Sequence, residues 1–263
     1  MVEPDKPRSP FAASIDSSPR PPLRALGPEE IAQILAAHRL YLETGRREGR
    51  RANFASANLS GMDFSGLDLR RVKMDRAVLR GADLRRANLQ RANLIGAVLE
   101  RAHLDNADLS GARLSGASLV SASFENARLA HAEMEFALMV KVVLRGASLP
   151  EADMSGAILD GAVLTRAELS SVNLRGAGLR DARLDEADLR GARLGGAFLA
   201  GASLRGADLR GAYLRLARLD GADLSGANLD GAEGLSQAQL DRAHGISGMT
   251  PPERLVRSED DKG

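Results

Sequence analysis

Residues 222–231 decide the fold, because they hold two successive copies of one five-residue unit: Ala222-Asp223-Leu224-Ser225-Gly226 and Ala227-Asn228-Leu229-Asp230-Gly231. The unit recurs without a slip through residues 52–232. A large apolar residue, the centre of each unit, returns at every fifth position from Phe54 to Leu229, which gives 36 units. A small residue, nearly always alanine, stands two positions before each centre. Repetition of this length predicts one quasi-linear unit rather than ordinary globular domains.

The five-residue spacing excludes the common regular structures. In an α-helix a step of five residues rotates the chain by a net angle of about 140°, so the centres would scatter around it. On a flat strand an odd spacing would place successive centres on opposite faces. Because alanine and centre are two apart and share one strand face, the chain must turn a corner once per unit. Glycine is common two residues after the centre, as at Gly61 and Gly81, where it suits a corner. We therefore predict an all-β solenoid, with alanines and centres inside and three residues of each unit outside.

The consensus Ala-(Asp/Asn)-Leu-x-Gly closely resembles the pentapeptide-repeat family, and the resemblance covers residues 52–232 of the 263. The spacing alone leaves three or four sides per coil open. The resemblance implies four: a right-handed quadrilateral β-helix with 20 residues per coil. The 36 units then make about nine coils, and stacked strands about 4.8 Å apart give a rod about 43 Å long.

Different composition marks the N-terminal end. Residues 1–27 are rich in proline, serine and charge, and are predicted to be a disordered tail. Pro28 then opens a predicted helix over 28–44, with acidic residues in its first turn. Its apolar stripe is expected to cover the open edge of the first coil, with His38 as a packed residue rather than a ligand. The stripe consists of Ile31, Ile34, Leu35, His38 and Leu42. Residues 28–51 thus form a capping helix and an arginine-rich linker.

The period breaks at Gly234, and the C-terminal end begins there. Ser236 and Gln239 form a capping-box pattern, which predicts a short helix near 236–243. Residues 233–249 are read as a C-terminal cap, with Ile246 and Met249 as further cover. Residues 250–263 are predicted to extend away as a flexible acidic tail.

No residue constellation predicts chemistry. The chain has no cysteine, its four histidines are dispersed, and it lacks a phosphate-binding loop. The filled interior of a solenoid leaves no pocket, so we expect neither an enzyme nor a bound cofactor or metal. The sequence also has no apolar run long enough for a membrane span and no secretory signal, so we expect a cytoplasmic protein.

Apolar residues occupy some outward positions where the repeat usually places polar ones. Stacking at 20 residues per coil would bring them together as a ridge that binds another protein, a second copy of this chain being the simplest partner. The alternative is that β-branched residues merely stack well along a ladder. The candidate ridge consists of Val78, Val98, Val120, Phe136, Leu138, Val140, Val143, Ile158, Val163 and Phe198.

Charge separates the functional hypotheses. Residues 52–232 carry 23 Lys and Arg against 22 Asp and Glu. Some pentapeptide-repeat proteins bind DNA gyrase, a type II topoisomerase, as acidic mimics of duplex DNA, but arginines stand here where a mimic would carry acids. No face of the predicted rod is basic throughout, so nucleic-acid binding is not predicted either. We predict a non-enzymatic scaffold or protein-interaction module, with gyrase regulation as the alternative. Leu119→Asp should disrupt neighbouring coils, whereas Asp108→Asn should be nearly silent.

Overall fold

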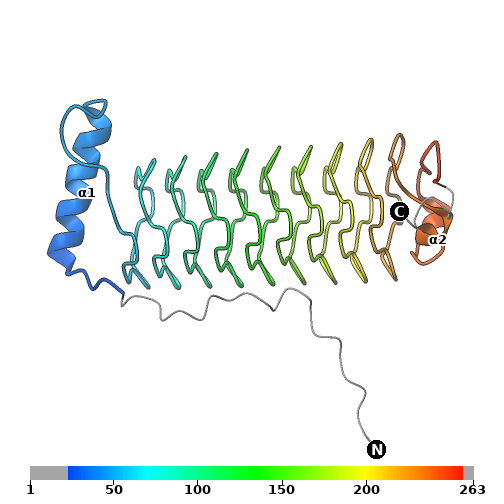
Figure 1. Cartoon of the computed structure of the whole chain (residues 1–263), viewed down its shortest axis with the longest axis horizontal. Helices are drawn as coiled ribbons and strands as arrows, with labels where there is room; N and C mark the ends of the chain where they lie inside the picture. Colours follow the sequence, from blue (N-terminus) through cyan, green and yellow to red (C-terminus); the bar gives the residue numbers. More distant parts are fainter. Residues whose placement is uncertain (1–22, 257–263) are drawn as a thin grey trace, which may run out of the picture.

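The computed structural model describes residues 23–256, and these form a rod of stacked coils with a helix at each end (Figure 1). From Asn53 to Tyr213, each residue that precedes a centre pairs in parallel with the residue 20 positions further on, as in Asn53 with Lys73 and Asn58 with Val78. Four such pairings per turn of the chain give a coil four sides. No phase slip occurs between residues 52 and 232.

Four outer faces follow from this pairing, and we name each by its first paired residue: the Asn53, Asn58, Asp63 and Asp68 faces. The paired residues form the middle column of a face. The residue two positions after each centre lies at a corner, where one face ends and the next begins. Residues in one column are therefore 20 apart in sequence and, at one strand spacing per coil, about 4.8 Å apart in space.

Backbone hydrogen bonds explain why the winding is regular. The N–H of Leu59 donates to the carbonyl of Val78 (2.7 Å), and the N–H of Val78 donates to the carbonyl of Ala57 (2.9 Å). The N–H of Gly61, at the corner, donates to the carbonyl of Arg80 (2.9 Å). Each coil therefore satisfies the backbone of its neighbour, as a buried backbone requires.

Glycine is common at the corners, as the sequence indicates, but it shares them with other residues. All 36 have a left-handed backbone, but only half are glycine. Arg86 has φ 58° and Phe136 has φ 56°, values that are uncommon for residues with a Cβ. A left-handed residue other than glycine costs about 1–2 kcal/mol, so the inter-coil hydrogen bonds must impose the corner geometry on any residue there.

The interior is filled. The centres and the small residues before them are at most 4% exposed through residue 232 wherever alanine or valine occupies the small position. Two large residues, Met62 and Leu67, occupy that position in the first coil, and Leu67 is 36% exposed. Only an end coil has room for them, because every other coil is covered on both sides.

At the N-terminal end, helix α1 (Pro28–Glu43) lies across the first coil (Figure 1). It ends one residue before the predicted 44. Ile31 joins the hydrophobic core, while Ile34 and Leu35 pack against it. Arg24 pairs with Ala57, so ordered backbone begins inside the range assigned to the tail. The reason is that the first coil has unpaired backbone groups at its open edge, which Arg24 satisfies.

At the C-terminal end, helix α2 (Gln237–Leu240) is shorter than the predicted 236–243. The capping box is present, with the N–H of Ser236 donating to Oε1 of Gln239 (2.8 Å). A 3₁₀ turn, η2 (Ile246–Gly248), follows. The predicted tail from residue 250 is wrong at its start. Thr250 pairs with Asn228 and Val256 pairs with Ser236, so the chain continues around the edge of the last coil.

Candidate interaction surfaces

The residues of the predicted ridge lie mainly on the Asn58 face. Backbone pairing places Val78, Val98, Ser118, Leu138 and Ile158 in one continuous column. Val143 pairs with Val163 on the adjacent Asp63 face. The columns that the repeat predicts are therefore the columns that the structure has. Phe136 is not in a middle column, because it occupies the corner between the Asn53 and Asn58 faces.

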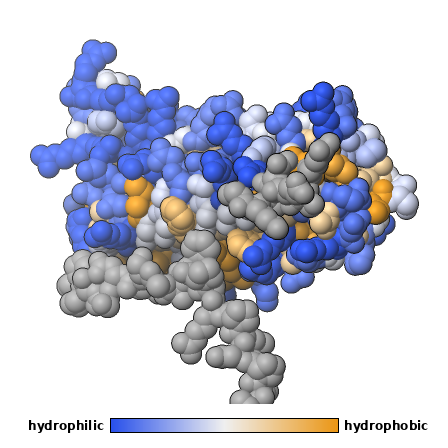
Figure 2. All heavy atoms as spheres, turned by 45° about the vertical axis from the view of Figure 1, so that its right-hand side comes forward, coloured by the Kyte–Doolittle hydropathy of each residue, from blue (hydrophilic) through white to orange (hydrophobic). Residues whose placement is uncertain are grey.

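The residues of the ridge are all apolar, but they differ widely in how much of each side chain is exposed. Phe136 is 68% exposed and Leu138 is 38% exposed, whereas Val78 is buried at 8%. The other seven members are half-buried. In the view of Figure 2 apolar residues show as separate spots on a largely hydrophilic surface. Most of the ridge therefore resembles a stacked ladder with partial shielding, and Phe136 with Leu138 forms its exposed part.

Charged side chains cover the C-terminal end of the ridge, at Phe198. The Phe198 ring lies between two guanidinium groups, 4.8 Å from that of Arg180 and 5.2 Å from that of Arg218. Arg180 also pairs with Asp160 (3.4 Å). A Cβ at Gly178 would lie 2.9 Å from Oδ1 of Asp160, so this carboxylate covers the glycine that interrupts the column.

Phe136 combines two unusual properties. Its backbone is left-handed and its ring is more exposed than any other large apolar side chain of the described residues. The ring lies over the next coil, since a Cβ added at Gly156 would be 2.6 Å from its Cε1. Strained residues cluster at functional sites, although strain by itself does not establish function. The sequence signal was available, since an aromatic at a corner is rare in this repeat.

The charged faces are neutralised within single units. Wherever the repeat reads Asp-Leu-Arg, the arginine folds back on the aspartate: Arg190 lies 2.6 Å from Asp188, and Arg210 lies 2.6 Å from Asp208. The Arg85 guanidinium lowers the pKa of Asp83 to about 2 by hydrogen bonding to its carboxylate. These carboxylates therefore do not form an uncompensated acidic surface. The predicted duplex mimic thus lacks the charge pattern it needs on these faces, and gyrase regulation stays a prediction.

His38 is buried at 1% exposure beneath α1. Its Nδ1 accepts a hydrogen bond from the N–H of Ala52 (3.1 Å), and Nε2 has no partner among the described residues. Burial lowers the pKa of His38, and nearby Arg51 and Arg70 lower it further against the opposing effect of Asp68. A neutral histidine that accepts a backbone N–H joins the helix to the first coil. No group of metal-ligating residues accompanies it in residues 23–256.

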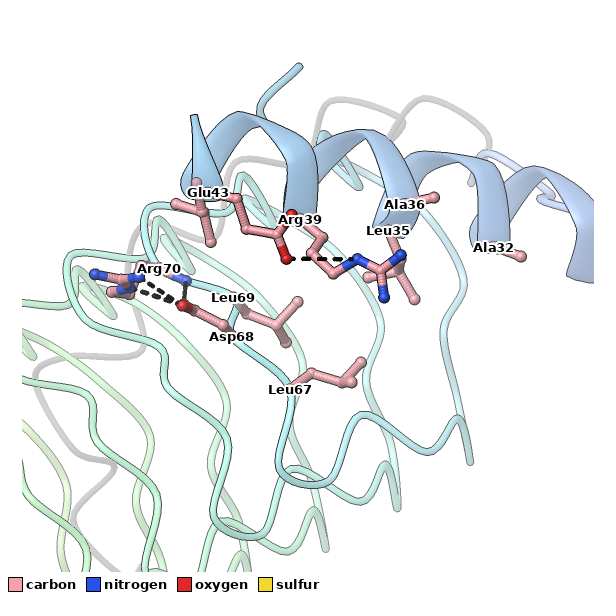
Figure 3. Close-up of a pocket in the computed structure, with 10 residues that line it drawn as sticks. Ala32, Leu35, Ala36, Arg39, Glu43, Leu67, Asp68, Leu69 and Arg70 are labelled. Atoms are coloured by element: carbon pink, nitrogen blue, oxygen red, sulfur yellow. Dashed lines mark hydrogen bonds and ion pairs between the residues drawn. The ribbon is translucent and has the colours of Figure 1, made fainter. Parts of the chain in front are cut away.

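The expectation of no pocket needs a correction at this end. A groove of about 500 Å³ lies between α1 and the first coil, outside the packed interior (Figure 3). Leu35 on the helix and Leu67 on the coil line it, with the Asp68–Arg70 ion pair (2.6 Å) at its side. A cylindrical helix laid across the square end of a rod cannot fill all of it. Of the helices described, none has the length and apolar character needed to cross a bilayer.

Stacked four-sided coils built from an Ala-x-Leu repeat define this protein as a β-solenoid. The family of pentapeptide repeats matches the sequence in eight copies, over residues 50–86, 82–119, 107–146, 137–176, 182–221, 199–233 and 207–244. This chain belongs to that family.

Solved structures include similar proteins. HetL, a pentapeptide repeat protein involved in heterocyst differentiation regulation in the cyanobacterium Nostoc sp. strain PCC 7120, is 33% identical; the match covers 79% of this chain and 92% of HetL, with a TM-score of 0.48. QnrB1, a plasmid-mediated fluoroquinolone resistance protein, is 20% identical, covering 78% and 94%, with a TM-score of 0.37. A pentapeptide repeat protein of the Arabidopsis thaliana thylakoid lumen is 35% identical, covering 45% and 68%, with a TM-score of 0.18. No curated protein matches the sequence.

Proposed function

We propose that this chain is a non-enzymatic interaction scaffold that binds another protein through the apolar ridge, with Phe136 and Leu138 as its contact residues. The observation that carries the proposal is Phe136, whose aromatic ring is 68% exposed at a corner with φ 56°. Half of the corners are glycine, which adopts this backbone without strain. A large apolar side chain kept there, and kept exposed, contributes more to a contact than to the fold.

The covered ends support the same proposal. We infer that the rod is a right-handed quadrilateral β-helix whose terminal helices act as caps. Ile31 of α1 and Leu240 of α2 are both buried. Arg24 and Thr250 pair with the backbone at the open edges. With its ends covered, a rod is protected from stacking end to end, and contact with partners falls to its faces.

The first test compares two corner residues. Phe136→Gly and Leu216→Gly both remove a large apolar residue from a left-handed corner, and Leu216, at 49% exposure, lies outside the ridge. Both variants should gain about 1 kcal/mol of stability, less whatever packing the side chain supplied. Only Phe136→Gly should weaken partner binding, measured by light scattering after size exclusion and by affinity capture with mass spectrometry.

The second test removes the ridge directly. Leu138→Asp combined with Ile158→Asp should abolish binding of the partner protein to the ridge while leaving the melting temperature close to that of the wild type, because both side chains point outward. If this variant has the same mass in solution as the wild type and captures the same proteins, the ridge is not a contact surface.

A further inference from the structure

Charge is distributed unevenly along the rod, although the whole is balanced. Residues 46–101 carry thirteen Lys and Arg against six Asp and Glu, whereas residues 102–161 carry four against eight. The first segment is therefore strongly basic and the second is acidic. A single balanced total over residues 52–232 conceals this.

The basic excess has a definite position on the Asn53 face and its edges. Arg51, Arg71 and Arg91 are 20 residues apart and share the corner column between the Asp68 and Asn53 faces. Lys73 lies in the middle column, and Arg76 lies at the opposite corner. Among residues 23–256, none of the five is in an ion pair. This group, which we call the basic band, therefore exposes uncompensated positive charge.

An acidic band lies on the same face further along the rod. Glu133 and Asp153 are paired neighbours in the middle column, and Glu151 occupies the corner column of the basic arginines. Glu133 contacts Arg113 (3.0 Å), and Glu135 accepts a hydrogen bond from Ser115 (2.6 Å). Glu133 and Glu151 are exposed. From Lys73 to Glu133 is three coils, or about 14 Å.

Two residues of each band are symmetric about the coil that contains Arg113. Lys73 and Asp153 lie two coils to either side of Arg113, and Arg71 and Glu151 lie two coils to either side of Gly111. A second rod laid antiparallel on this face, with a two-fold axis at Arg113, would set Arg71 opposite Glu151 and Lys73 opposite Asp153, twice over. The other three basic residues would meet uncharged corners or a histidine: Ser171, Gly156 and His131.

The same register places Phe136 opposite Gly96, since these corners lie one coil to either side of Gly116. A bare glycine corner leaves room for the exposed ring, and the Arg76 side chain passes over Gly96, 3.7 Å from where a Cβ would stand. The ring would therefore meet both open backbone and a cation. The arginines that meet on the axis are the two Arg113 side chains, each held by the Glu133 of its own chain.

We propose that the partner of this face is a second copy of the same chain, packed antiparallel in a two-fold dimer through the Asn53 face. A two-fold arrangement uses one self-complementary surface and closes on itself. It rests on the proposed function only in taking Phe136, at the corner between the Asn53 and Asn58 faces, as a contact residue, and it leaves Leu138 of the Asn58 face outside the dimer contact. No exposed aromatic lies within the basic band to stack a base, and Asp75 lies between Lys73 and Arg76, so a phosphate backbone fits this surface less well.

Reversal and restoration of charge test the proposal. Light scattering of the full chain at low salt should give a dimer, and about 1 M salt, where screening acts over about 3 Å, should dissociate it. Arg71→Glu/Lys73→Glu and Glu151→Lys/Asp153→Lys should each raise the dimer dissociation constant at least about tenfold. An equimolar mixture of the two variants, or all four changes in one chain, should restore the dimer. Arg86→Glu/Arg101→Glu is the control, because these corner arginines form no ion pair within the described part of the chain and lie on other edges.

Several results would overturn the dimer. One is a wild type that is monomeric at all protein and salt concentrations. Another is an equimolar mixture of the two charge-reversal variants that fails to associate. A third is an assembly whose mass keeps rising above that of a dimer as the protein concentration increases. A labelled 30-base-pair DNA that binds the wild-type monomer and is lost with Arg71→Glu/Lys73→Glu would assign the band to nucleic acid instead. If Phe136→Gly keeps the dimer while charge reversal breaks it, Phe136 is not a contact residue of the dimer and the electrostatic interface stands.

Discussion

The middle coils and the two ends of the rod obey different rules. A middle coil such as that of Leu119 both donates backbone hydrogen bonds to, and accepts them from, the coil before it and the coil after it, and its interior is sealed on both sides. The first and last coils have one neighbour each, and helices, a single pairing residue or a partial turn complete them. In the middle, the repeat determines structure. At the ends, structure depends on residues outside the repeat.

The largest difference should follow from placing a charge in the core. Leu119 is fully buried, so Leu119→Ala should cost about 2–5 kcal/mol, and Leu119→Asp more than about 5 kcal/mol because a carboxylate there has no partner. Leu229→Asp, in the last regular coil, should unravel that coil and leave the rest folded. Urea unfolding with hydrogen exchange distinguishes the two. Equal loss of protection along the whole rod in both variants would contradict the comparison.

The N-terminal cover should matter less, and locally. Ile31→Asp removes the α1 residue that joins the core and should cost about 2–3 kcal/mol. Exchange protection should fall at the amides of the first two coils only. Ala32→Asp, the same change at the next and exposed position, should leave protection unchanged. If both variants behave alike, Ile31 does not hold the helix on the coil.

Acidic pH should destabilise the N-terminal end of the rod through protonation of His38. Its pKa is lowered from 6.5 in the folded chain, chiefly by burial, so the unfolded chain takes up a proton that the folded chain resists. The stabilisation is complete above pH 6.5 and is lost as pH falls toward the lower folded pKa. His38→Gln, whose amide oxygen can still accept from Ala52, should flatten this dependence in melts between pH 7 and pH 5, whereas His131→Gln should not. A pH profile that His38→Gln leaves unchanged would assign the effect elsewhere.

The repeat allowed the coil, the columns and the interior to be predicted. The centre of each five-residue unit shows which side chains lie inside, and four sides of five residues each place paired residues 20 apart in sequence. It could not predict where order ends, since Arg24 and Thr250 pair through backbone groups that any residue has. It also could not predict how far each ridge residue is shielded. Val78 and Leu138 share a column yet differ fivefold in exposure, at 8% and 38%. The bands of the Asn53 face could have been read from the columns, had charges been compared coil by coil.

The smallest effect should come from Asp108→Asn, which the structure makes less silent than the sequence predicted. Asp108 accepts hydrogen bonds from the Ser110 hydroxyl (2.6 Å) and the Gln90 amide (2.8 Å), and its side chain is only 18% exposed. Burial raises the pKa of Asp108, but these hydrogen bonds outweigh burial, so the pKa lies below 3.8. Asparagine can keep the Ser110 contact, whereas its amide nitrogen would face a Gln90 donor, so we expect a loss of about 0.5 kcal/mol at pH 7. The stability that Asp108 contributes is lost as pH falls below 3.8, and Asp108→Asn should lack that part of the fall in stability at acidic pH.

Asp230→Asn at the C-terminal end is the matched control, because Asp230 is exposed and its carboxylate accepts no hydrogen bond from another described residue. Equal melting curves for the two variants at pH 7 would show that the hydrogen bonds of Asp108 contribute nothing net, and that middle and end differ only in their cores.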